Sequence, residues 1–400
     1  MATAVLVLNC GSSSVKYALI DPDSGHRHLV GLAERVGSPE VSVKATRGSD
    51  SYQVHPQDSS HAGVLTEVLR EVSELPGVSV RAVGHRVVHG GEHFAASVLV
   101  DEGAVAAIKA VTSLAPLHNP ANLTGIEAAS AALPGVPQVA VFDTAFHQSM
   151  PPSSFRYAVP ARWYREHGVR RYGFHGTSHR YVSEKAAELL GRPVEETCLV
   201  TAHLGNGCSA AAVKGGLSMD TSMGLTPLEG LVMGTRSGDI DPGVLPYVAE
   251  REGSDLSAVL AALNKDSGLL GLSELSNDMR TVSTAARQGS EAASLAIEVF
   301  CYRLAKYVAA LTVPLGRLDA LVFTGGIGEN DAWVRSKTMA LLGFLGIVED
   351  EAANAEHGRA SSGRVSRAGD TLALVVPTDE ELVIARDTAA LVPDEGRSSR

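Results

Sequence analysis

Apolar and polar positions along the chain alternate between two periods, and this alternation predicts a succession of strands and helices. Near the N-terminus, residues 4–9 and 15–20 have the apolar, β-branched composition of strands, and residues 10–14 between them form a small-residue turn. Residues 136–142 are a continuous apolar run, which is typical of a strand buried on both faces. The mixture indicates an α/β protein.

Helix signals occur between these strands. Asp101 is placed to cap a helix that runs to residue 113, and Asn119 with Pro120 begins another, with proline in the first helical position. The second half of the chain repeats the alternation. Its expected strands cover residues 197–202, 210–213, 320–324 and 372–376. A helix-rich stretch is expected over about residues 242–313, and single helices over residues 331–342 and 378–391.

Two segments resemble each other and suggest an internal duplication. LNCGSSS at residues 8–14 and LGNGCSA at residues 204–210 each place a glycine and small residues after an apolar strand, with Gly11 and Gly207 as counterparts. Two prolines and two serines at residues 150–154 interrupt both periods and predict a linker. We therefore expect a duplicated α/β core with a ligand cleft between its halves.

Composition narrows the class of protein. The 400 residues include 34 basic and 45 acidic side chains, a formal net charge of −11, which disfavours binding to nucleic acid or to an anionic membrane surface. Four cysteines without a C-x-x-C pair argue for reduced thiols rather than a disulfide framework. No apolar run reaches the roughly 18 residues of a membrane helix, and no basic residues precede the N-terminal apolar stretch. We expect a soluble, cytoplasmic protein.

Several familiar catalytic motifs are absent from the sequence. No glycine is followed by lysine, neither H-R-D nor D-F-G occurs, and no glycine turn completes G-x-G-x-x-G. Histidines spaced by four residues could hold a metal ion. However, His85, His89 and His93 bracket two glycines, and His175 and His179 lack the glutamate of H-E-x-x-H. We therefore expect turn and cleft histidines rather than a zinc site.

Three glycine-rich turns follow apolar strands, at residues 9–14, 203–207 and 324–330. Backbone N–H groups in such turns bind anions. One turn of this kind would be ordinary, but three at strand ends favour a cleft for a polyphosphate.

These segments together resemble the acetokinase family of the acetate and sugar kinase/Hsp70/actin superfamily. The matching stretches run in family order from residue 5 to residue 382: VLVLNCGSSSVK, HRVVHGG, PLHNPANL, FDTAFH, YGFHGTSH, HLGNGCS, MGTRSGDIDPG, SNDMR, FTGGIGEN and PTDEEL. The resemblance implies an α/β fold of two domains with a duplicated ribonuclease-H-like (actin-like ATPase) core. The expected N-terminal domain covers residues 1–149 and 382–400, and the nucleotide-binding domain covers residues 150–381.

The resemblance also implies the chemistry. Members of the family transfer the γ-phosphoryl group of ATP to acetate, reversibly and with Mg²⁺, giving acetyl phosphate and ADP by direct in-line transfer. Acetate is already an anion at pH 7 and needs no general base. Catalysis should therefore depend on positioning and on cations around the transferring group.

The matching motifs imply the roles of four side chains. Arg86 and Arg236 match the clamp on the carboxylate and phosphoryl groups, where a guanidinium can bind two oxygens at once. His175 matches the donor to an equatorial phosphoryl oxygen. Asp143 matches the catalytic aspartate, which we expect to orient Arg236 or the metal shell, because no proton has to be removed.

The resemblance further implies how magnesium and ATP are bound. Asn9 and Glu380 match the metal ligands, acting partly through water, which suits a cation that keeps its hydration; Mn²⁺ is an alternative ion. Ser12 and Ser14 line the first turn, and Lys16 is the side chain there that we expect to reach a phosphate.

Other segments match the nucleotide and acid pockets. Thr378 and Glu381 have the spacing of a capping box, so we expect Glu381 to be structural. Met279 lies where the family varies. The expected nucleotide contacts are His203, Leu204, Gly205, Asn206, Gly207, Asp278, Met279, Arg280, Gly326, Ile327, Gly328, Glu329 and Asn330. The expected pocket for the acetate methyl group consists of Val88, Leu117, Phe174 and Pro227.

Two alternatives remain open at this point. A propionate or butyrate kinase of the same family would have the same catalytic groups and a wider pocket. A non-catalytic ATPase of the superfamily would move a partner through domain closure, although the clamp arginines and His175 argue against it. The family also implies a homodimer, with which the apolar helix expected at residues 295–311 is compatible.

Overall fold

The computed structural model describes residues 2–116 and 118–392 and divides the chain into two compact units. Unit 1 comprises Met1–Phe146 and Asp379–Arg400, and unit 2 comprises His147–Thr378. The chain thus passes between units at residues 147 and 379, where the sequence suggested 150 and 382. Among the described residues, none of the helices has the length and hydropathy that crossing a bilayer requires.

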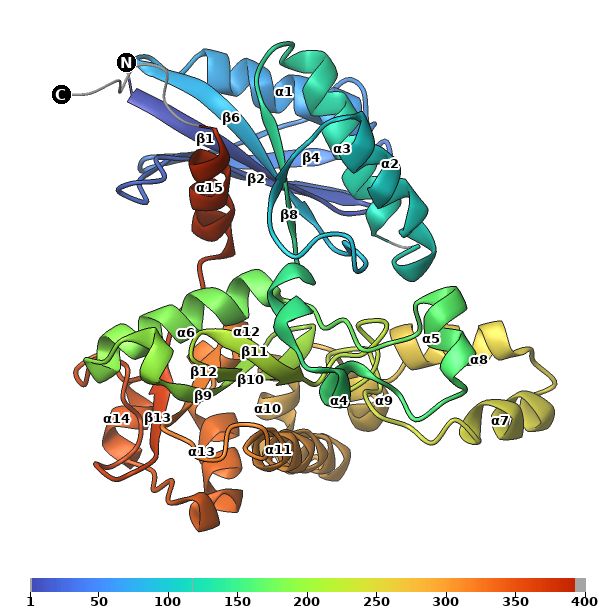
Figure 1. The fold of residues 1–400 in the computed structure, drawn as a ribbon, viewed down its shortest axis with the longest axis vertical. Helices are drawn as coiled ribbons and strands as arrows, with labels where there is room; N and C mark the ends of the chain where they lie inside the picture. Colours follow the sequence, from blue (N-terminus) through green and yellow to red (C-terminus); the bar gives the residue numbers. More distant parts are fainter. Residues whose placement is uncertain (1, 117, 393–400) are drawn as a thin grey trace. The chain divides into compact units, whose positions relative to one another are not determined.

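Unit 1 is built on one sheet with the strand order β5-β4-β3-β2-β1-β6-β8-β7 (Figure 1). Its strands are β1 (Ala2–Cys10), β2 (Ser14–Ile20), β3 (Arg27–Glu34), β4 (Ser42–Arg47), β5 (Asp50–Val54), β6 (Val78–Val87), β7 (Val98–Leu99) and β8 (Gln138–Phe142). Its main helices are α1 (His61–Ser73), α2 (Glu102–Ala110), α3 (Asn119–Ala132) and α15 (Glu380–Leu391).

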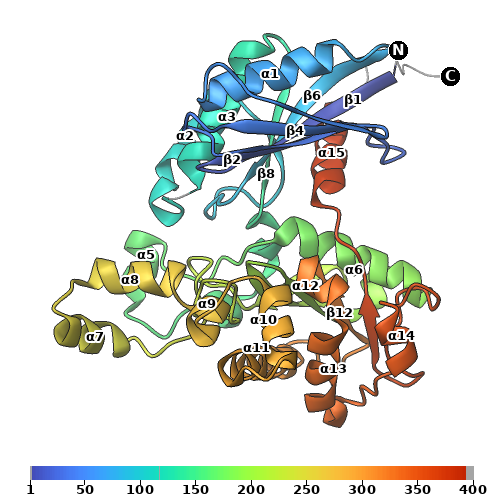
Figure 2. The same cartoon turned by 180° about the vertical axis from the view of Figure 1, so that it is seen from behind.

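Helices cover both faces of this sheet (Figures 1 and 2). Val83 of β6 belongs to the apolar cluster that includes α1 and α3. The next residue, Gly84, points to the other face, where a Cβ atom would lie 2.4 Å from Thr388 Oγ1 and 2.7 Å from Ile384 Cγ2 of α15. Only glycine lets this last helix pack so closely on the sheet. The C-terminal segment is therefore part of the N-terminal unit.

Unit 2 has a five-stranded sheet with the order β11-β10-β9-β12-β13. Its strands are β9 (Cys198–Leu204), β10 (Cys208–Lys214), β11 (Leu217–Thr221), β12 (Ala320–Thr324) and β13 (Leu372–Val375). Its helices are α4 (Pro152–Phe155), α5 (Ala161–His167), α6 (Gly176–Leu190), α7 (Val244–Glu252), α8 (Leu256–Lys265), α9 (Gly268–Ser273), α10 (Met279–Arg287), α11 (Glu291–Leu311), α12 (Gly325–Asn330), α13 (Ala332–Leu341) and α14 (Glu351–Ala355). Helices α6 and α11 lie on opposite faces of the sheet (Figure 1).

The two sheets share one plan, which confirms the duplication. In unit 1 the order β3-β2-β1-β6-β8 has two antiparallel pairings followed by two parallel ones, and β11-β10-β9-β12-β13 in unit 2 repeats them. The turns that contain Gly11 and Gly207 each join the first two strands of their unit. The two sequence echoes are thus equivalent hairpin turns.

The predicted linker at residues 150–154 is wrong. This stretch lies in unit 2, and α4 begins within it, with two residues between it and a 3₁₀ helix, Ala145–Ser149, that spans the unit boundary. Pro152 is the first residue of α4, a position where its missing N–H costs nothing. The two prolines therefore begin a short helix instead of keeping the chain extended.

Two predicted helix ends also differ from the structure. The helix expected at residues 101–113 is capped by Asp101 as predicted but ends at Ala110, and a separate 3₁₀ turn, Thr112–Leu114, follows. The last helix begins at Glu380 and not at Thr378. Its cap is Asp379, whose carboxylate accepts a hydrogen bond from the N–H of Leu382 at 3.0 Å.

The capping box of Thr378 and Glu381 is accordingly wrong, because Asp379 takes the capping position. Glu381 instead lies 3.6 Å from the guanidinium of Arg27, which is also 2.6 Å from Asp379. Burial raises the pKa of Glu381, and Arg27 opposes this shift. Glu381 thus has the structural role expected of it, but through an ion pair.

Candidate functional site

In unit 1, three of the predicted site residues meet at the ends of neighbouring elements. Strands β6 and β8 are parallel, with Val87 paired to Phe142, so Arg86 near the end of one lies beside Asp143 just after the other. Arg86 donates from Nε to Asp143 Oδ1 at 2.9 Å and from Nη2 to Oδ2 at 2.6 Å. Glu380 Oε2, at the start of α15, lies 3.9 Å from Arg86 Nη2.

Burial and charge pairing have opposite effects on the pKa values of this cluster. Only 2 % of the Asp143 side chain is exposed, and burial raises its pKa, while the Arg86 guanidinium opposes that shift. Burial lowers the pKa of Arg86, but Asp143 and Glu380 outweigh it and leave this pKa raised. Arg86 is therefore a firmly charged cation. Its partner is Asp143, which sequence reasoning had assigned to Arg236 or the metal shell.

The predicted magnesium and phosphate residues at the N-terminus of unit 1 lie on the first hairpin. Asn9 near the end of β1 is half-buried and pairs in register with Lys16 of β2, which is exposed. Ser12 lies in the exposed turn between the strands, and Ser14 begins β2. The first glycine turn thus presents its polar groups at one end of the sheet.

The side chains of Asn9 and Glu380 are of the types that bind magnesium. Asn9 and Glu380 offer an amide and a carboxylate oxygen, and Mg²⁺ is usually held by one or two protein oxygens together with waters and substrate phosphates. Within the described residues no three His, Cys, Asp or Glu side chains form a metal cluster. The donor set fits an ion that is bound largely through the nucleotide.

In unit 2, Arg236 and His175 converge on the second glycine turn. A Cβ atom at Gly207 would lie 2.7 Å from Arg236 Nη2 and 3.4 Å from His175 Cε1. Arg236 Nη1 donates to the carbonyl of Pro227 at 2.5 Å, and among the described residues no carboxylate pairs with this guanidinium. Burial lowers the pKa of Arg236. The turn is thus bordered by a half-buried cation whose charge the fold leaves unmatched.

His175 lies immediately before α6 in a left-handed conformation, with φ of 57°. Non-glycine residues adopt this region rarely, and such strain concentrates at functional sites. Its Nδ1 is hydrogen-bonded to Ser209 Oγ at 2.9 Å, and its ring stacks on that of His203 with centroids 4.4 Å apart. The ring orientation is therefore set by β9 and β10.

The three predicted nucleotide segments line one cavity of unit 2, with a volume of about 480 Å³. This size falls in the usual range for small-molecule sites. Of the expected contacts, the cavity includes Gly205, Asn206, Asp278, Met279, Arg280, Gly326, Ile327 and Asn330. It does not include His203, Leu204, Gly207, Gly328 or Glu329, and it adds two residues that sequence reasoning missed, Asn277 and Asp331.

Glu329 has a different position from the one expected. Its Oε1 accepts hydrogen bonds from the N–H of Gly325 at 3.0 Å and from the N–H of Thr378 at 3.2 Å. Gly325 has φ of +75°, and a Cβ there would lie 2.8 Å from the Leu204 carbonyl, so glycine is required at this junction. Glu329 thus anchors the start of α12 to the last residue of unit 2.

The third glycine segment is itself a helix. We expected a turn at residues 324–330, but α12 begins at Gly325, directly after β12. Arg335, which is fully buried, donates to the carbonyls of Gly328 at 2.8 Å and of Glu329 at 3.0 Å. This short helix is therefore held from both ends.

The expected acid-pocket residues are divided between the units. Val88, half-buried after β6, donates its N–H to Asn122 Oδ1 at 3.0 Å. In unit 2, Phe174 is buried, and the carbonyl of Pro227 binds Arg236. Leu117 lies outside the described residues.

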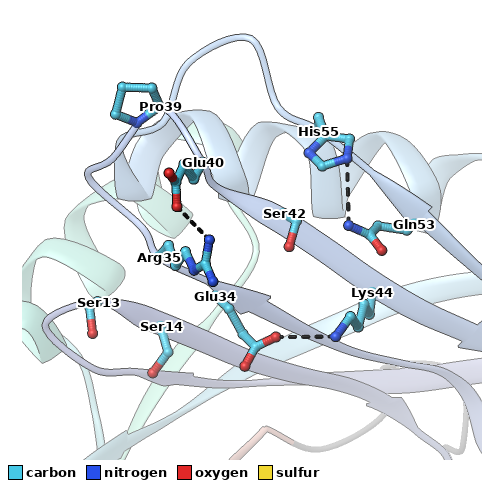
Figure 3. Close-up of a pocket in the computed structure, with 10 residues that line it drawn as sticks. All are labelled: Ser13, Ser14, Glu34, Arg35, Pro39, Glu40, Ser42, Lys44, Gln53 and His55. Atoms are coloured by element: carbon cyan, nitrogen blue, oxygen red, sulfur yellow. Dashed lines mark hydrogen bonds and ion pairs between the residues drawn. The ribbon is translucent and has the colours of Figure 1, made fainter.

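A second cavity lies in unit 1, with a volume of about 680 Å³ (Figure 3). Ser14 is the one predicted site residue in its wall. Its charged side chains are paired with one another, Arg35 with Glu40 and Lys44 with Glu34. Because these charges cancel, we assign no ligand to this cavity.

Two buried histidines should make the stability of the protein depend on pH. Burial lowers the pKa values of His85 and His147 to about 4. The unfolded chain, with histidine pKa near 6.5, therefore binds more protons between pH 4 and pH 6.5, and stability falls as the pH is lowered through this window. From pH 7 to pH 5 we expect each histidine to cost about 2 kcal/mol of unfolding free energy.

Urea unfolding at the two pH values measures this loss. His85→Asn, which keeps a side chain able to bond Gln138, should lose about 2 kcal/mol less than the wild type over the same interval. An equal loss in both proteins would contradict the assignment of a neutral buried His85.

A duplicated five-stranded α/β core, with a nucleotide-sized cavity beside glycine turns in the second unit, defines a two-domain, actin-like ATPase fold. The comparisons specify the family. Residues 4–386 match the model of the acetokinase family. The acetate kinase of Deinococcus radiodurans is 57% identical over 98% of both chains. This chain belongs to the acetokinase family.

Solved structures agree. A propionate kinase from Francisella tularensis is 45% identical, with a TM-score of 0.92 and coverage of 98% of this chain and 100% of its own. The Porphyromonas gingivalis acetate kinase is 44% identical, with the same TM-score and the same coverage.

Proposed function

We propose that this chain catalyses the reversible transfer of the γ-phosphoryl group of ATP to acetate, giving acetyl phosphate and ADP. The observation that carries the proposal is the unmatched guanidinium of Arg236, which borders the Gly207 turn beside His175. Both the phosphoryl group and the acid are anions, so an arginine that the fold does not neutralise suits their encounter. Relatives named acetate kinase at 57% and 59% identity support acetate as the acceptor.

Each side chain then has a part in the reaction. Arg86, oriented by Asp143, binds the acid, and Arg236 and His175 stabilise the charge on the transferring group. Asn9 and Glu380 would hold Mg²⁺, which neutralises phosphate charge when bound. Asp143 has both oxygens engaged with Arg86, so it acts as a positioning group and not as a base.

The oligomeric state and the cellular location of the enzyme are also proposed. We propose a homodimer in the cytoplasm. Leu295 and Tyr302 of α11, which are 54% and 56% exposed, are the apolar side chains of that helix available to an interface. Light scattering measures the mass of the assembly.

A hydroxamate assay for acetyl phosphate, with acetate, propionate and butyrate at matched concentrations, tests the function. We expect kcat/KM to be highest for acetate. A higher value for propionate would favour the alternative of a propionate kinase. The structural relative named propionate kinase supports that alternative. ATP hydrolysis without any acyl phosphate would indicate an ATPase of the superfamily that transfers no phosphoryl group to an acid.

Val88 tests the expected size of the acid pocket. If this side chain contacts the methyl group of acetate, Val88→Ala makes room for a longer acid. We expect the propionate-to-acetate ratio of kcat/KM to rise by about tenfold to two-hundredfold, the usual value of one methylene. Val80→Ala, the same change at a half-buried position earlier in β6, is the control. A ratio that stays constant in both variants would remove Val88 from the pocket.

A further inference from the structure

The histidine pair His175 and His179 is part of a chain of hydrogen bonds. Ser209 Oγ lies 2.9 Å from His175 Nδ1 and 2.7 Å from His179 Nε2. Beyond it, His179 Nδ1 lies 2.7 Å from Thr201 Oγ1, whose other possible acceptor, the Ala211 carbonyl, is at the much weaker distance of 3.5 Å. The two histidines are one helical turn apart, and Thr201 and Ser209 lie on the sheet face that α6 covers.

Among the described residues the two histidines are the only side-chain partners of Ser209 Oγ, so its proton goes to one of them and the chain can carry protons in only two orders. His179 is fully buried, and burial, with His147 and His203 nearby, lowers its pKa well below 6.5. A neutral imidazole has one donor and one acceptor nitrogen. Either Ser209 accepts from His175 Nδ1 and donates to His179, or Ser209 accepts from His179 and donates to His175 Nδ1.

The neighbours of His175 decide between the two orders. In the first, Nδ1 carries the proton, and Nε2 can donate to a phosphoryl oxygen only if the ring gains a second proton and becomes a cation. That cation would lie beside the Arg236 guanidinium at the Gly207 turn and against the stacked ring of His203. In the second order the proton is already on Nε2, which faces the turn, and the ring stays neutral.

We propose that Thr201, His179 and Ser209 form a relay that holds His175 as the neutral tautomer with its proton on Nε2. Thr201 donates to His179 Nδ1, His179 Nε2 donates to Ser209, and Ser209 donates to His175 Nδ1. His179 and Ser209 are positioning residues for phosphoryl transfer, a role that rests on the proposed function. A neutral imidazole is an effective hydrogen-bond donor to a developing oxyanion when its tautomer is fixed.

The tautomer can be observed without any activity. In protein labelled with ¹⁵N-histidine, long-range ¹⁵N–¹H correlation spectra separate the protonated from the unprotonated ring nitrogen, and the His175 signals are identified by their loss in His175→Gln. At pH 7 we expect a protonated Nε2 and an unprotonated, hydrogen-bonded Nδ1. A proton on Nδ1, or on both nitrogens, would overturn the proposal.

Two alanine variants provide the kinetic test. Ser209→Ala removes the donor to His175, whereas Ser218→Ala removes a hydroxyl that lies 2.7 Å from His147 Nδ1, outside the relay. Both serines are fully buried and each hydrogen-bonds a histidine, so Ser218→Ala controls for the loss of a buried hydroxyl. We expect Ser209→Ala to lower kcat at least about tenfold with KM values nearly unchanged, because a catalytic histidine in the wrong tautomer is a poor catalyst. Ser218→Ala should retain wild-type kcat.

A variant at the far end of the relay provides a second test in case Ser209→Ala does not fold. Thr201→Val keeps the side-chain volume and removes the hydroxyl, so it should lower kcat in the same direction and shift the ¹⁵N signals of His175. Wild-type kcat together with unchanged ¹⁵N shifts in Ser209→Ala or Thr201→Val would refute the relay. Absence of acetyl phosphate formation by the wild type would instead refute the proposed function, and the tautomer spectrum would still decide the relay.

Discussion

Arg236→Ala is expected to lower kcat/KM for acetate by about a hundredfold to a thousandfold, the usual cost of removing one preorganised donor to a transition state. The same change should leave the free energy of unfolding unchanged or slightly higher. Within the described chain the Arg236 guanidinium makes a single hydrogen bond, to the Pro227 carbonyl, and no carboxylate compensates its charge. A partly buried cation without a counter-charge lowers the free energy of unfolding, so removing it should not destabilise the protein.

Initial rates in the hydroxamate assay and urea unfolding of the same preparations measure the two effects. Arg236→Lys keeps the charge but not the fork that can bind two oxygens, and it should retain only part of the activity. Arg192→Ala, which breaks an ion pair with Asp319 elsewhere in unit 2, is the control for losing an arginine. Near-wild-type kcat/KM in Arg236→Ala would contradict the role of this side chain in phosphoryl transfer.

The fold was predictable to the extent that it depends on local pattern. Strand β12 has the predicted bounds, residues 320–324, because a fully buried strand is a continuous apolar run. The hairpin turns at Gly11 and Gly207 were recognisable because a tight turn after a strand needs small residues. The two turns also suggested the duplication, and the strand order that both sheets repeat confirms it.

The errors occurred where two local rules compete. Asp379 and Thr378 can each cap a helix, and the sequence does not say which one reaches the N–H of Leu382. Pro151 and Pro152 fit a linker and a first helical turn equally well, and the packing of α4 against β11 decides for the helix. Such choices depend on tertiary contacts that periodicity does not contain.

The candidate site was predictable as a set of motifs but not as a set of partners. Glu329 belongs to a nucleotide motif, yet its carboxylate binds the N–H groups of Gly325 and Thr378. Ser209 drew no attention because a serine in a strand is common. The register of β10 against β9, which pairs Ser209 with His203, was the signal that could have placed it near His175.

The partner of Asp143 was also not predictable from the sequence, and this pairing should have the largest effect on the free energy of unfolding. Two parallel strands bring its carboxylate to Arg86. Removing either partner leaves the other largely buried without its main counter-charge, since the Asp143 and Arg86 side chains are 2% and 21% exposed. We expect Arg86→Ala and Asp143→Ala each to lower the free energy of unfolding by about 3–5 kcal/mol, in contrast to Arg236→Ala.

The double variant separates folding from catalysis. Arg86→Met with Asp143→Leu replaces the ion pair by apolar groups of similar size, which is often neutral or even stabilising. We expect this double variant to be at least as stable in urea as the wild type and to lack measurable acetyl phosphate formation. Stability lost additively in the double variant would mean that the two side chains do not act as a pair. Retained activity would mean that Arg86 does not bind the acid. A stable but inactive double variant would show that the fold does not need the ion pair and that the reaction requires the cation which Asp143 orients.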